Sequence, residues 1–599
     1  MASQYDPSTG GIDFLRSSTV FSGLDPESFN ALAAVLRWDS FDEGEVLFNE
    51  GDPGDRFFVV LHGRLAISRH SNEKDTLIGW VMPGESVGEL ALMEDQTRTA
   101  TVSAYRATVT VSLRRQDYET LTKSTPQCLV LLNRLLTMRL RQVMTAGAKQ
   151  QVSAEILAVV AASKDAPLPA FTEGLCRCLQ KEGPVLHLPP GRLEQLVGAD
   201  ADRGKLLTWL NEQEKLYRFI VLEADIEDTP WTERCLRHGD RVLLIARANA
   251  KPGALMGGAG SPPPEHNGVA RPRLLILIQD DKAAMPKGTK AWLDAVPVTD
   301  HHHLRMGVEG DIERLGRFLR GKSVSLALAG GAALGFAHIG VMRALKEAGI
   351  PVDLVCGTSM GSILGGQVAF GMSWEDIQRE TRKHFRGNSV YDYTLPVISL
   401  CKAQRMDERL RMVVGDVAIE DLWLKFFCVS TNLTKASQEV HESGTLVRAM
   451  RASSAIPGLF PPIKKDTGDM LVDGALVNNL PADIAAQKTG GAVIAVNVIP
   501  TVDKVTTAGY VEGASAFSVI MSRRKKIEAE QSPVMADLLL RSVFLQSVSA
   551  AEKIRTRASV YIEPPLEGFT LLNTFRFDEI VEVGYKAAVE KLATWTPAL

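Results

Sequence analysis

The first part of the chain, residues 21–111, is a series of short apolar runs separated by glycines. Residues 56–61 and 64–68 are two such runs, with turn-forming residues between them. Short strands divided by dense turn residues are typical of a small β-barrel or roll. From residue 117 to about 143 the spacing changes, and leucines recur every three or four positions, which predicts a helix. We therefore expect a β-roll with helices over residues 20–145.

The next segment, residues 153–320, alternates strand-like and helix-like stretches. Apolar runs at 219–222, 242–245 and 274–278 are separated by stretches with helical spacing. This alternation predicts a middle α/β domain.

The last segment, residues 322–599 with its core at 324–485, repeats a strand–turn–helix pattern. Apolar runs at 324–328 and 352–355 are each followed by a glycine-rich turn and a helix-like stretch, and a further run lies at 492–498. Such repetition predicts a mainly parallel sheet with helices on both faces. A chain of 599 residues is long enough for three domains of this kind.

Composition narrows the class of protein. A net charge of -4 argues against a nucleic-acid binder, which would carry a basic excess. The seven cysteines are scattered and form no C-x-x-C pair, which favours a reducing compartment and no thiolate metal site. The polar N-terminus does not have the layout of a signal peptide, and no stretch has the pattern of a membrane span. We expect a cytoplasmic protein, for which peripheral contact with the inner membrane face is an option. The oligomeric state stays open.

The clearest chemical motif is a G-x-S-x-G sequence, from Gly357 to Gly361, with Ser359 at its centre. It follows an apolar run and precedes an apolar helix-like stretch, the context that a nucleophile elbow requires. The alternative is an ordinary Gly-Ser turn. In this context we expect Ser359 to be exposed on a strained turn at the positive end of a helix.

A serine nucleophile needs a base. The last histidine is His441, and no histidine follows Asp473, which excludes the order Ser, Asp473, His of the α/β-hydrolases. His338, His384 and His441 stay open as partners in another arrangement, although each is individually more typical of surface or packing positions.

A second glycine-rich turn follows the run at 324–328 and opens a helix. Small residues there leave backbone N–H groups uncovered, and such groups stabilise an oxyanion. The G-x-G-x-x-G spacing of a dinucleotide-binding loop is not met. The predicted oxyanion loop consists of Gly330, Gly331, Ala332, Ala333, Leu334 and Gly335.

Together these motifs resemble the patatin-like phospholipase family, whose pattern is a glycine-rich loop, then G-x-S-x-G, then Asp-Gly. The Asp-Gly pair is Asp473–Gly474, and residues 451–462 and 477–481 resemble the family's flanking segments. The resemblance implies a Ser-Asp dyad without histidine and without a catalytic cofactor. Ser359 would attack an ester of a phospholipid or lysophospholipid, and Asp473 would be its base.

The chain departs from the family pattern in the oxyanion loop. The family usually has Arg or Lys just before the last glycine, where this chain has Leu334, and a common glycine is replaced by Ala332. These changes bring the rate and the substrate into question more than the class of reaction.

The N-terminal roll carries a second motif. Gly88, Glu89 and Leu90, followed by Arg98 and Thr99, resemble the phosphate cassette of cyclic-nucleotide-binding domains. Arg98 would bind the cyclic phosphate and Glu89 the ribose 2′-hydroxyl. Thr99 hints at cyclic GMP over cyclic AMP. The alternative is a roll that keeps the fold and binds nothing. We expect a regulatory nucleotide.

Two further patterns suggest ligand sites that their context does not support. Residues 316–323 match G-x-x-x-x-G-K-[ST], but a helix-like stretch precedes them and a strand follows, which is the reverse of a phosphate loop. His301, His302 and His303 could suggest a metal, yet adjacent side chains point in different directions, and exposed or interdomain histidines are the preferred interpretation. With the region around Trp231 and Trp292, the histidine run extends the resemblance to bacterial proteins of the neuropathy-target-esterase type.

Residues 390–400 and 459–463 are apolar segments near the motifs. They are candidates for lids or walls around an acyl chain, and buried packing is the alternative. Two other functions stay open for the whole chain: a regulatory or scaffold protein with a decayed esterase site, and a broad acyl esterase or acyltransferase.

Overall fold

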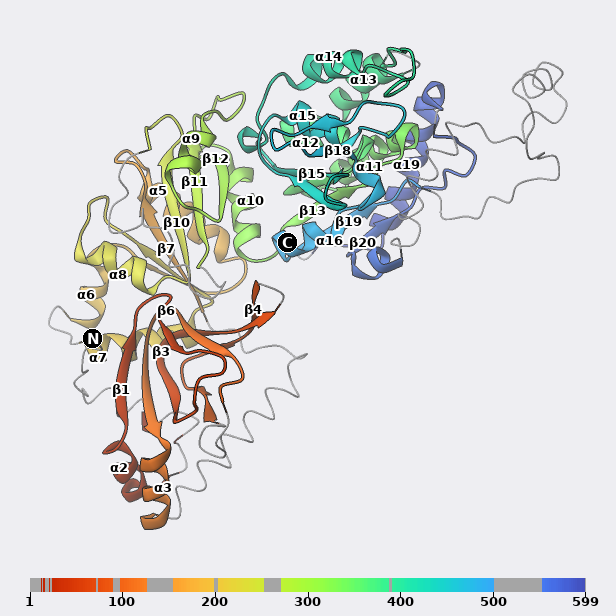
Figure 1. The fold of residues 1–599 in the computed structure, drawn as a ribbon. Helices are drawn as coiled ribbons and strands as arrows, with labels where there is room; N and C mark the ends of the chain where they lie inside the picture. Colours follow the sequence, from red (N-terminus) through yellow and green to blue (C-terminus); the bar gives the residue numbers. More distant parts are fainter. Residues whose placement is uncertain are drawn as a thin grey trace, which may run out of the picture. The chain divides into compact units, whose positions relative to one another are not determined.

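The computed structural model describes residues 24–71, 74–89, 97–125, 154–198, 203–252, 271–386, 390–499, 552–571 and 573–597, with four single positions before residue 22 (Figure 1). The chain divides into two compact units. One comprises residues 1–281 and 288–312, and the other comprises residues 282–287 and 313–599.

The first unit begins with an antiparallel β-roll. Its strands follow the order β1-β6-β3-β4, with β2 paired to β6 and β5 to β3. The strands are β1 (Arg37–Phe41), β2 (Val46–Phe48), β3 (Arg56–Ser71), β4 (Lys74–Val81), β5 (Ser86–Val87) and β6 (Thr101–Arg114). The predicted runs 56–61 and 64–68 belong to one strand, β3, because pairing with β6 continues across the register shifts between Val60 and Leu65.

Helices flank the roll. Helix α2 (Pro26–Ala33) has a proline at its first position and Asp25 as its N-cap, which accepts a hydrogen bond from the Ser28 N–H. Helix α3 (Arg115–Ser124) follows β6 directly. The rest of the helix that we predicted to residue 143 lies outside the described residues.

The same unit continues into a six-stranded sheet whose strand pairs are all parallel, in the order β12-β11-β10-β7-β9-β8. Its strands are β7 (Glu155–Ala161), β8 (Val185–Leu188), β9 (Phe219–Glu223), β10 (Arg241–Arg247), β11 (Arg273–Gln279) and β12 (Asp300–Arg305). The helices that alternate with them are α5 (Leu168–Leu179), α6 (Arg192–Val197), α7 (Arg203–Leu216), α8 (Pro230–His238) and α9 (Thr289–Ala295). Helix α10 (Glu309–Leu319) begins in this unit, and its residues from 313 onward belong to the second. The α/β expectation for the middle segment is confirmed.

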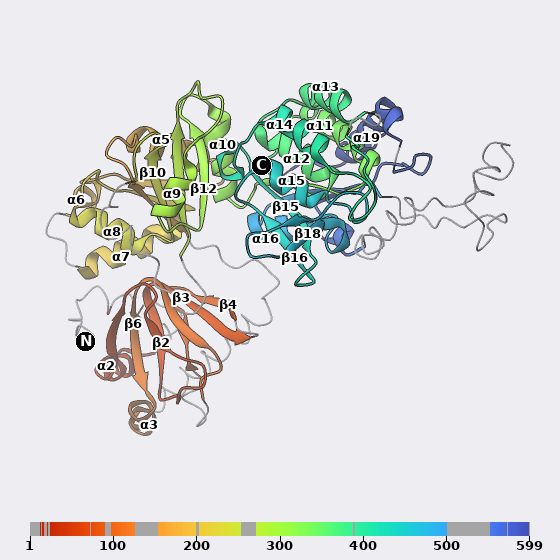
Figure 2. The ribbon, with the colours of Figure 1, turned by 45° about the horizontal axis from the view of Figure 1, so that its top comes forward.

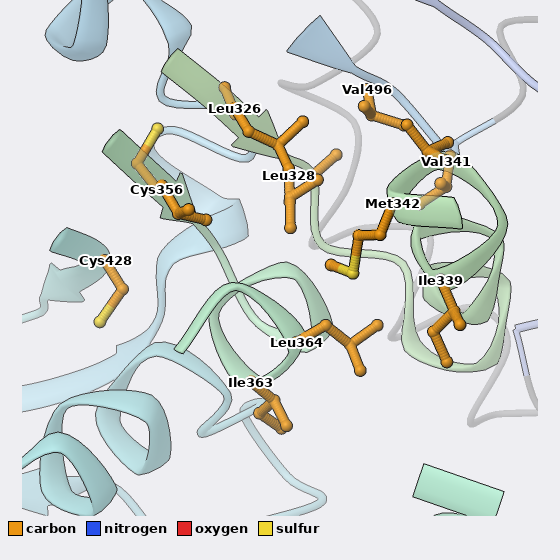
Figure 3. Close-up of a cluster of buried hydrophobic side chains, with 14 of the residues drawn as sticks. Leu326, Leu328, Ile339, Val341, Met342, Cys356, Ile363, Leu364, Cys428 and Val496 are labelled. Carbon is orange, nitrogen blue, oxygen red and sulfur yellow. The ribbon is translucent and has the colours of Figure 1, made fainter. Parts of the chain in front are cut away.

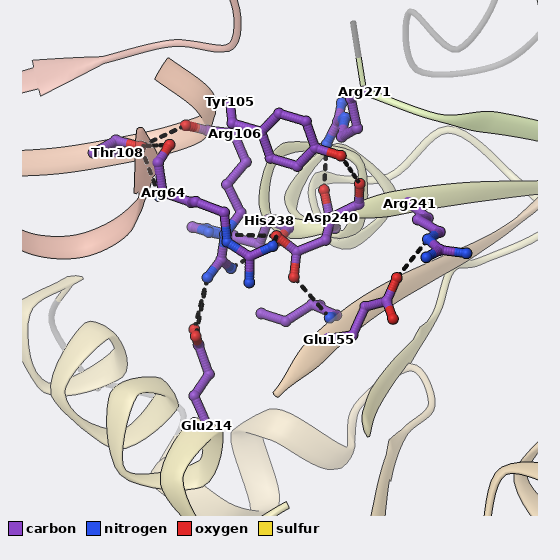
Figure 4. Close-up of polar contacts among 12 residues, drawn as sticks. Arg64, Tyr105, Arg106, Thr108, Glu155, Glu214, His238, Asp240, Arg241 and Arg271 are labelled. Carbon is purple, nitrogen blue, oxygen red and sulfur yellow. Dashed lines mark hydrogen bonds and ion pairs between the residues drawn. The ribbon is translucent and has the colours of Figure 1, made fainter. Parts of the chain in front are cut away.

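A buried polar network joins the roll to this sheet (Figure 4). Arg106 of β6 is fully buried, and its Nη2 lies 3.0 Å from both carboxylate oxygens of Glu214 on α7. Its Nε lies 3.2 Å from Asp240 Oδ1, and its Nη1 donates to the His238 carbonyl at the end of α8. Asp240 also accepts a hydrogen bond from the Ile156 N–H. Arg106 is therefore the centre of the contact between the two sheets.

The histidine run corrects one expectation. His301, His302 and His303 lie on β12, where His302 and His303 are buried rather than exposed. Successive side chains of a strand point to opposite faces, and both faces of β12 are covered at these positions. His303 lies 3.1 Å from Gln279 Nε2 on the neighbouring strand.

The second unit is built on an eight-stranded sheet in the order β17-β18-β15-β14-β13-β19-β20, with β16 paired to β15. Its strands are β13 (Val324–Leu328), β14 (Leu354–Gly357), β15 (Lys425–Asn432), β16 (Ser437–His441), β17 (Ile463–Lys464), β18 (Met470–Asp473), β19 (Ala492–Val496) and β20 (Val560–Ile562). Strands β15, β14, β13, β19 and β20 are parallel, whereas β16, β17 and β18 run antiparallel to their partners. The antiparallel margin was not predicted.

Helices cover this sheet on both faces (Figure 2). They are α11 (Ala337–Glu347), α12 (Met360–Phe370), α13 (Trp374–Phe385), α14 (Gln404–Val414), α15 (Leu446–Ser453), α16 (Ala482–Thr489) and α19 (Phe577–Leu592), with 3₁₀ turns at Ala332–Phe336, Ile419–Asp421, Gly474–Leu476 and Thr574–Arg576. In the core, apolar side chains of β13 and β14 pack against α11 and α12 (Figure 3). Within the described residues, we find no helix with the length and apolar character needed to cross a bilayer.

Candidate active site

The two predicted loops of the site start from adjacent strands. β13 and β14 are parallel neighbours, and Leu328 at the end of β13 pairs with Gly357 at the end of β14. Parallel strands bring their carboxyl ends to the same edge of a sheet. The glycine-rich loop after β13 and the G-x-S-x-G turn after β14 therefore lie side by side.

Ser359 occupies a strained turn between β14 and α12. Its φ is 53°, in the left-handed region that non-glycine residues rarely adopt, and it is the N-cap residue of α12. Gly361 allows this turn to pack closely, because a Cβ there would lie 2.2 Å from the Leu328 carbonyl oxygen. This is the geometry expected of a nucleophile elbow.

Asp473 lies opposite Ser359 at the end of β18. The Ser359 hydroxyl donates a hydrogen bond of 2.7 Å to Asp473 Oδ2, and the Ala475 N–H donates to Oδ1 at 2.9 Å. Ser359 is 3% exposed, so the expectation of an exposed serine is wrong, and Asp473 is fully buried. Burial raises the pKa of the Asp473 carboxyl to about 7, against the opposing effect of the two hydrogen bonds. A base with this pKa is suited to accept a proton near neutral pH.

Hydrogen bonds fix both partners of this contact. The Ser359 N–H donates to the Ser453 hydroxyl oxygen at 3.0 Å, and that hydroxyl donates to the Val429 carbonyl on β15. The Thr431 hydroxyl donates to the Asp473 carbonyl at 2.8 Å. Sequence reasoning missed Ser453, although it lies within the segment 451–462 that resembles the family.

The glycine-rich loop is held by Asn479. The Gly330 N–H donates to the Asn479 side-chain oxygen at 3.1 Å, and the Asn479 amide donates to the Gly330 carbonyl at 3.2 Å. A Cβ at residue 330 would lie 2.9 Å from the Ser359 Cβ, so the loop passes directly beside the serine. Asn479 was not singled out from the sequence, because its role depends on a contact 149 residues away along the chain.

The amides of the loop are not equivalent. Those of Gly330, Ala333 and Leu334 donate to carbonyl groups of Asn479, Leu571 and Gly331, in that order. Among the described hydrogen bonds, none uses the N–H of Gly331 or Ala332. These two amides are the best remaining candidates for oxyanion donors. Ala332 has a φ of 45°, which a glycine would adopt without strain.

Two further positions of the loop, Leu334 and Gly335, pack against neighbouring side chains. Leu334, where the family usually has a cation, is 2% exposed and packs in the hydrophobic core. The Leu334 side chain is therefore part of the hydrophobic core. Gly335 also packs closely, because a Cβ there would lie 2.5 Å from the Met360 side chain.

The three histidines that the sequence left open contact other groups. His338 Nε2 lies 2.8 Å from the Ala329 carbonyl, and burial lowers its pKa to about 4. His441 Nε2 lies 2.7 Å from the Ser430 hydroxyl oxygen, and burial lowers the pKa of His441 to about 4 as well. His384 lies near Arg409 and Glu380. In the described hydrogen bonds, the partner of the Ser359 hydroxyl is Asp473 and none of these three histidines.

The predicted nucleotide residues lie together in the roll. Arg98 is buried, donates to the carbonyls of Gly88 (3.3 Å) and Arg56 (2.7 Å), and its guanidinium lies 4.0 Å from the ring centre of Phe48. Glu89 is buried next to Gly88, whereas Thr99 is exposed. Leu90 lies outside the described residues. To bind Arg98, a cyclic phosphate would have to replace the carbonyl groups of Gly88 and Arg56 as its hydrogen-bond partners.

The roll, the parallel middle sheet and the buried serine–aspartate contact define a multidomain protein of the patatin-like class. Family models match in three places: "Patatin-like phospholipase" at residues 326–486, "Neuropathy Target Esterase family P-loop like domain" at 153–326, and "Cyclic nucleotide-binding domain" at 38–125. In the kind and order of its matched domains, the chain is similar to the patatin-like phospholipases of the neuropathy-target-esterase type that carry a cyclic nucleotide-binding domain.

Curated relatives agree with this assignment. Patatin-like phospholipase domain-containing protein 6 of Homo sapiens is 30% identical over 94% of this chain and 45% of its own length. Protein 7 of that name from Mus musculus is 29% identical over 92% of this chain and 45% of its own length. Lysophospholipase nte1 of Neosartorya fischeri is 28% identical over 94% of this chain and 42% of its own length. The chain thus spans about half the length of these relatives.

Although the middle segment matches a P-loop-like model, the G-x-x-x-x-G-K-[ST] sequence at 316–323 is not a phosphate loop. It begins within α10 and leads into β13, the reverse of the strand–loop–helix order. The expectation from sequence is confirmed on this point.

Proposed function

We propose that this chain is a serine hydrolase that cleaves carboxylic esters of phospholipids or lysophospholipids. The observation that carries the proposal is the 2.7 Å hydrogen bond from Ser359 to Asp473, a buried carboxyl group with a pKa of about 7. A nucleophile within hydrogen-bonding reach of a base with a matched pKa is the arrangement that nucleophilic catalysis requires.

The reaction proceeds in two steps. In the first, Ser359 Oγ attacks the ester carbonyl while Asp473 takes its proton, and the N–H groups of Gly331 and Ala332 stabilise the oxyanion. The tetrahedral intermediate collapses, the alcohol leaves with the proton from Asp473, and an acyl-enzyme forms. In the second step, Asp473 takes a proton from the water that attacks the acyl-enzyme, and it returns this proton to Ser359 Oγ as the fatty acid leaves.

The substrate class rests on the family and on relatives. One relative is named a lysophospholipase and others are named patatin-like phospholipase domain-containing proteins. The buried Ser359 fits an acyl substrate that is transferred out of a lipid phase into a closed site. The headgroup and the acyl position stay open.

We further propose that a cyclic nucleotide regulates this activity through the roll. Support comes from the grouping of Gly88, Glu89 and Arg98, and from the match of this segment to the cyclic nucleotide-binding model. Arg98 would exchange its carbonyl partners for the cyclic phosphate, which offers charged acceptors.

Two substitutions test the dyad. Ser359→Ala and Asp473→Asn should each abolish release of fatty acid from a lysophospholipid, with a loss of at least about 10³-fold. Ser359→Ala should also abolish labelling by a fluorophosphonate. The matched controls are Ser454→Ala and Asp469→Asn, because both residues are buried in the same unit and neither contacts Ser359 or Asp473 in the described bonds.

The outcomes separate the candidate functions. Folded wild-type protein that releases no fatty acid and takes no label at Ser359 would favour a regulatory or scaffold protein with a decayed site. Transfer of the acyl group to an added alcohol in preference to water would favour an acyltransferase.

A further inference from the structure

A short hairpin in the second unit, residues 391–403, presents large apolar side chains to solvent. It lies between α13 and α14, and its tip carries Leu395, Val397 and Ile398, which are 79%, 82% and 75% exposed, after Tyr393 at 65%. Single exposed apolar residues are normal in proteins, but a contiguous group of this size marks an interaction site. Buried packing, the alternative that the sequence left for this segment, is therefore wrong for the tip.

The base of the hairpin is well bonded. Tyr393 and Cys401 form an antiparallel bridge, the Thr394 N–H donates to the Leu400 carbonyl, and the Lys402 N–H donates to the Asp392 carbonyl. The Asp392 carboxylate accepts hydrogen bonds from the N–H groups of Ala403 and Arg405. The backbone thus holds the tip in place while its apolar side chains are exposed.

Two cations lie at the base of the hairpin. Lys402 and Arg405 are both exposed, and Lys402 makes no ion pair among the described contacts. The carboxylate of Asp392, also at the base, already has backbone partners. An apolar tip above a cationic base matches a lipid surface, in which acyl chains lie below phosphate groups.

The hairpin is connected to the dyad through one segment. The N–H groups of Leu400 and Cys401 donate to the carbonyls of Gly458 and Leu459, at 2.8 and 2.9 Å. A few residues earlier in that segment, the Ala455 carbonyl accepts a hydrogen bond from the Asp473 N–H at 2.9 Å. The exposed tip is therefore fixed to the same backbone that positions the base.

We propose that the tip at residues 393–398 inserts into a phospholipid surface, with Lys402 and Arg405 at the level of the lipid phosphates. The hairpin then docks the second unit on the phase that holds its substrate. Its role in supplying substrate rests on the proposed esterase function, whereas insertion itself does not depend on catalysis.

The test compares the full-length wild type with the triple variant Leu395→Ser, Val397→Ser, Ile398→Ser in sedimentation with vesicles of equal parts phosphatidylcholine and phosphatidylserine. Binding should weaken on the order of 10-fold for each side chain removed. The control is Leu433→Ser, which removes a 51% exposed leucine outside the hairpin and should leave binding unchanged. Lys402→Gln should weaken binding to these vesicles and leave binding to pure phosphatidylcholine vesicles unchanged.

Hydrolysis separates this proposal from the esterase function. The triple variant should keep wild-type activity on a water-soluble short-chain ester and lose activity on phospholipid in vesicles. A wild type that binds vesicles through the tip but hydrolyses no ester would contradict the esterase function alone. Equal vesicle binding by wild type and triple variant would overturn the docking proposal. So would self-association of the wild type that the triple variant abolishes without a change in vesicle binding, because the tip would then be an interface between copies.

Discussion

At the scale of single residues, the burial of Asp473 has a consequence for pH dependence. Asp473 acts as a base only when ionised, and burial raises its pKa to about 7. We therefore expect log kcat/KM for a soluble ester to rise with unit slope below about pH 7 and to level off above it. A profile that stays flat down to about pH 5 would contradict the role of this carboxyl group as the titrating base.

The same shift affects stability. Because the folded-state pKa of Asp473 is higher than its unfolded value of about 4, the folded protein binds more protons between about pH 4 and pH 7. The contribution of this group to the free energy of unfolding is present at low pH and is lost as pH rises through about 7. In Asp473→Asn, urea unfolding should depend less on pH over this range than in the wild type.

Ala332 gives a second prediction at this scale. A φ of 45° costs a non-glycine residue about 1–2 kcal/mol in the folded state. Glycine has the opposite effect on stability, because its greater freedom in the unfolded chain lowers the free energy of unfolding by about 0.4–1 kcal/mol. Ala332→Gly should therefore change the free energy of unfolding by less than about 1 kcal/mol, or stabilise the protein. Ala344→Gly, in the interior of α11, is the control and should destabilise by about 1 kcal/mol or more. Equal losses in thermal unfolding would contradict the strain at residue 332.

At the scale of elements, β6 is joined to α7 and α8 by the charges around Arg106. Arg106→Met would remove the buried guanidinium that contacts both Glu214 and Asp240, and would leave Arg64 beside Asp240; the cost should be about 3–5 kcal/mol. Arg237→Met removes an exposed ion pair with Asp42 across the same contact and should cost less than about 1 kcal/mol.

Urea unfolding followed by far-ultraviolet circular dichroism measures both variants. Adding Glu214→Gln to Arg106→Met should recover part of the loss, because one uncompensated charge is then removed. If Arg106→Met is no more destabilising than Arg237→Met, the buried network does not stabilise the contact between the roll and the sheet.

Elements also explain how far the site could be predicted. The turns after β13 and β14 were predictable, because strand, glycines and helix follow one another locally along the sequence. Asp473 entered through its resemblance to the family, since its place next to Ser359 depends on β18 pairing antiparallel to β15. Ser453 and Asn479 carry no local signal, because each acts through a hydrogen bond to a distant segment.

At the scale of the whole molecule, the proposed nucleotide regulation can be measured. Cyclic AMP or cyclic GMP should change ester hydrolysis by about 5–150-fold if it is coupled to the catalytic domain, and Arg98→Gln should abolish that effect while leaving basal hydrolysis intact. Binding shown by calorimetry without any change in hydrolysis would contradict the coupling. The division into domains at 20–145, 153–320 and 322–599 stays a prediction.

The sequence by itself determined the class of fold, the catalytic serine candidate and the order of the segments, because local spacing of apolar, glycine and polar residues encodes strands, turns and helices. Tertiary structure alone decided which groups meet. It placed Asp473 in a buried position that raises its pKa, buried the side chains of Leu334, His302 and His303, and left the tip at 393–398 exposed. The physical reason is that burial and long-range contact depend on which surfaces pack together, and apolar residues look the same in a sequence whether a neighbouring element covers them or not.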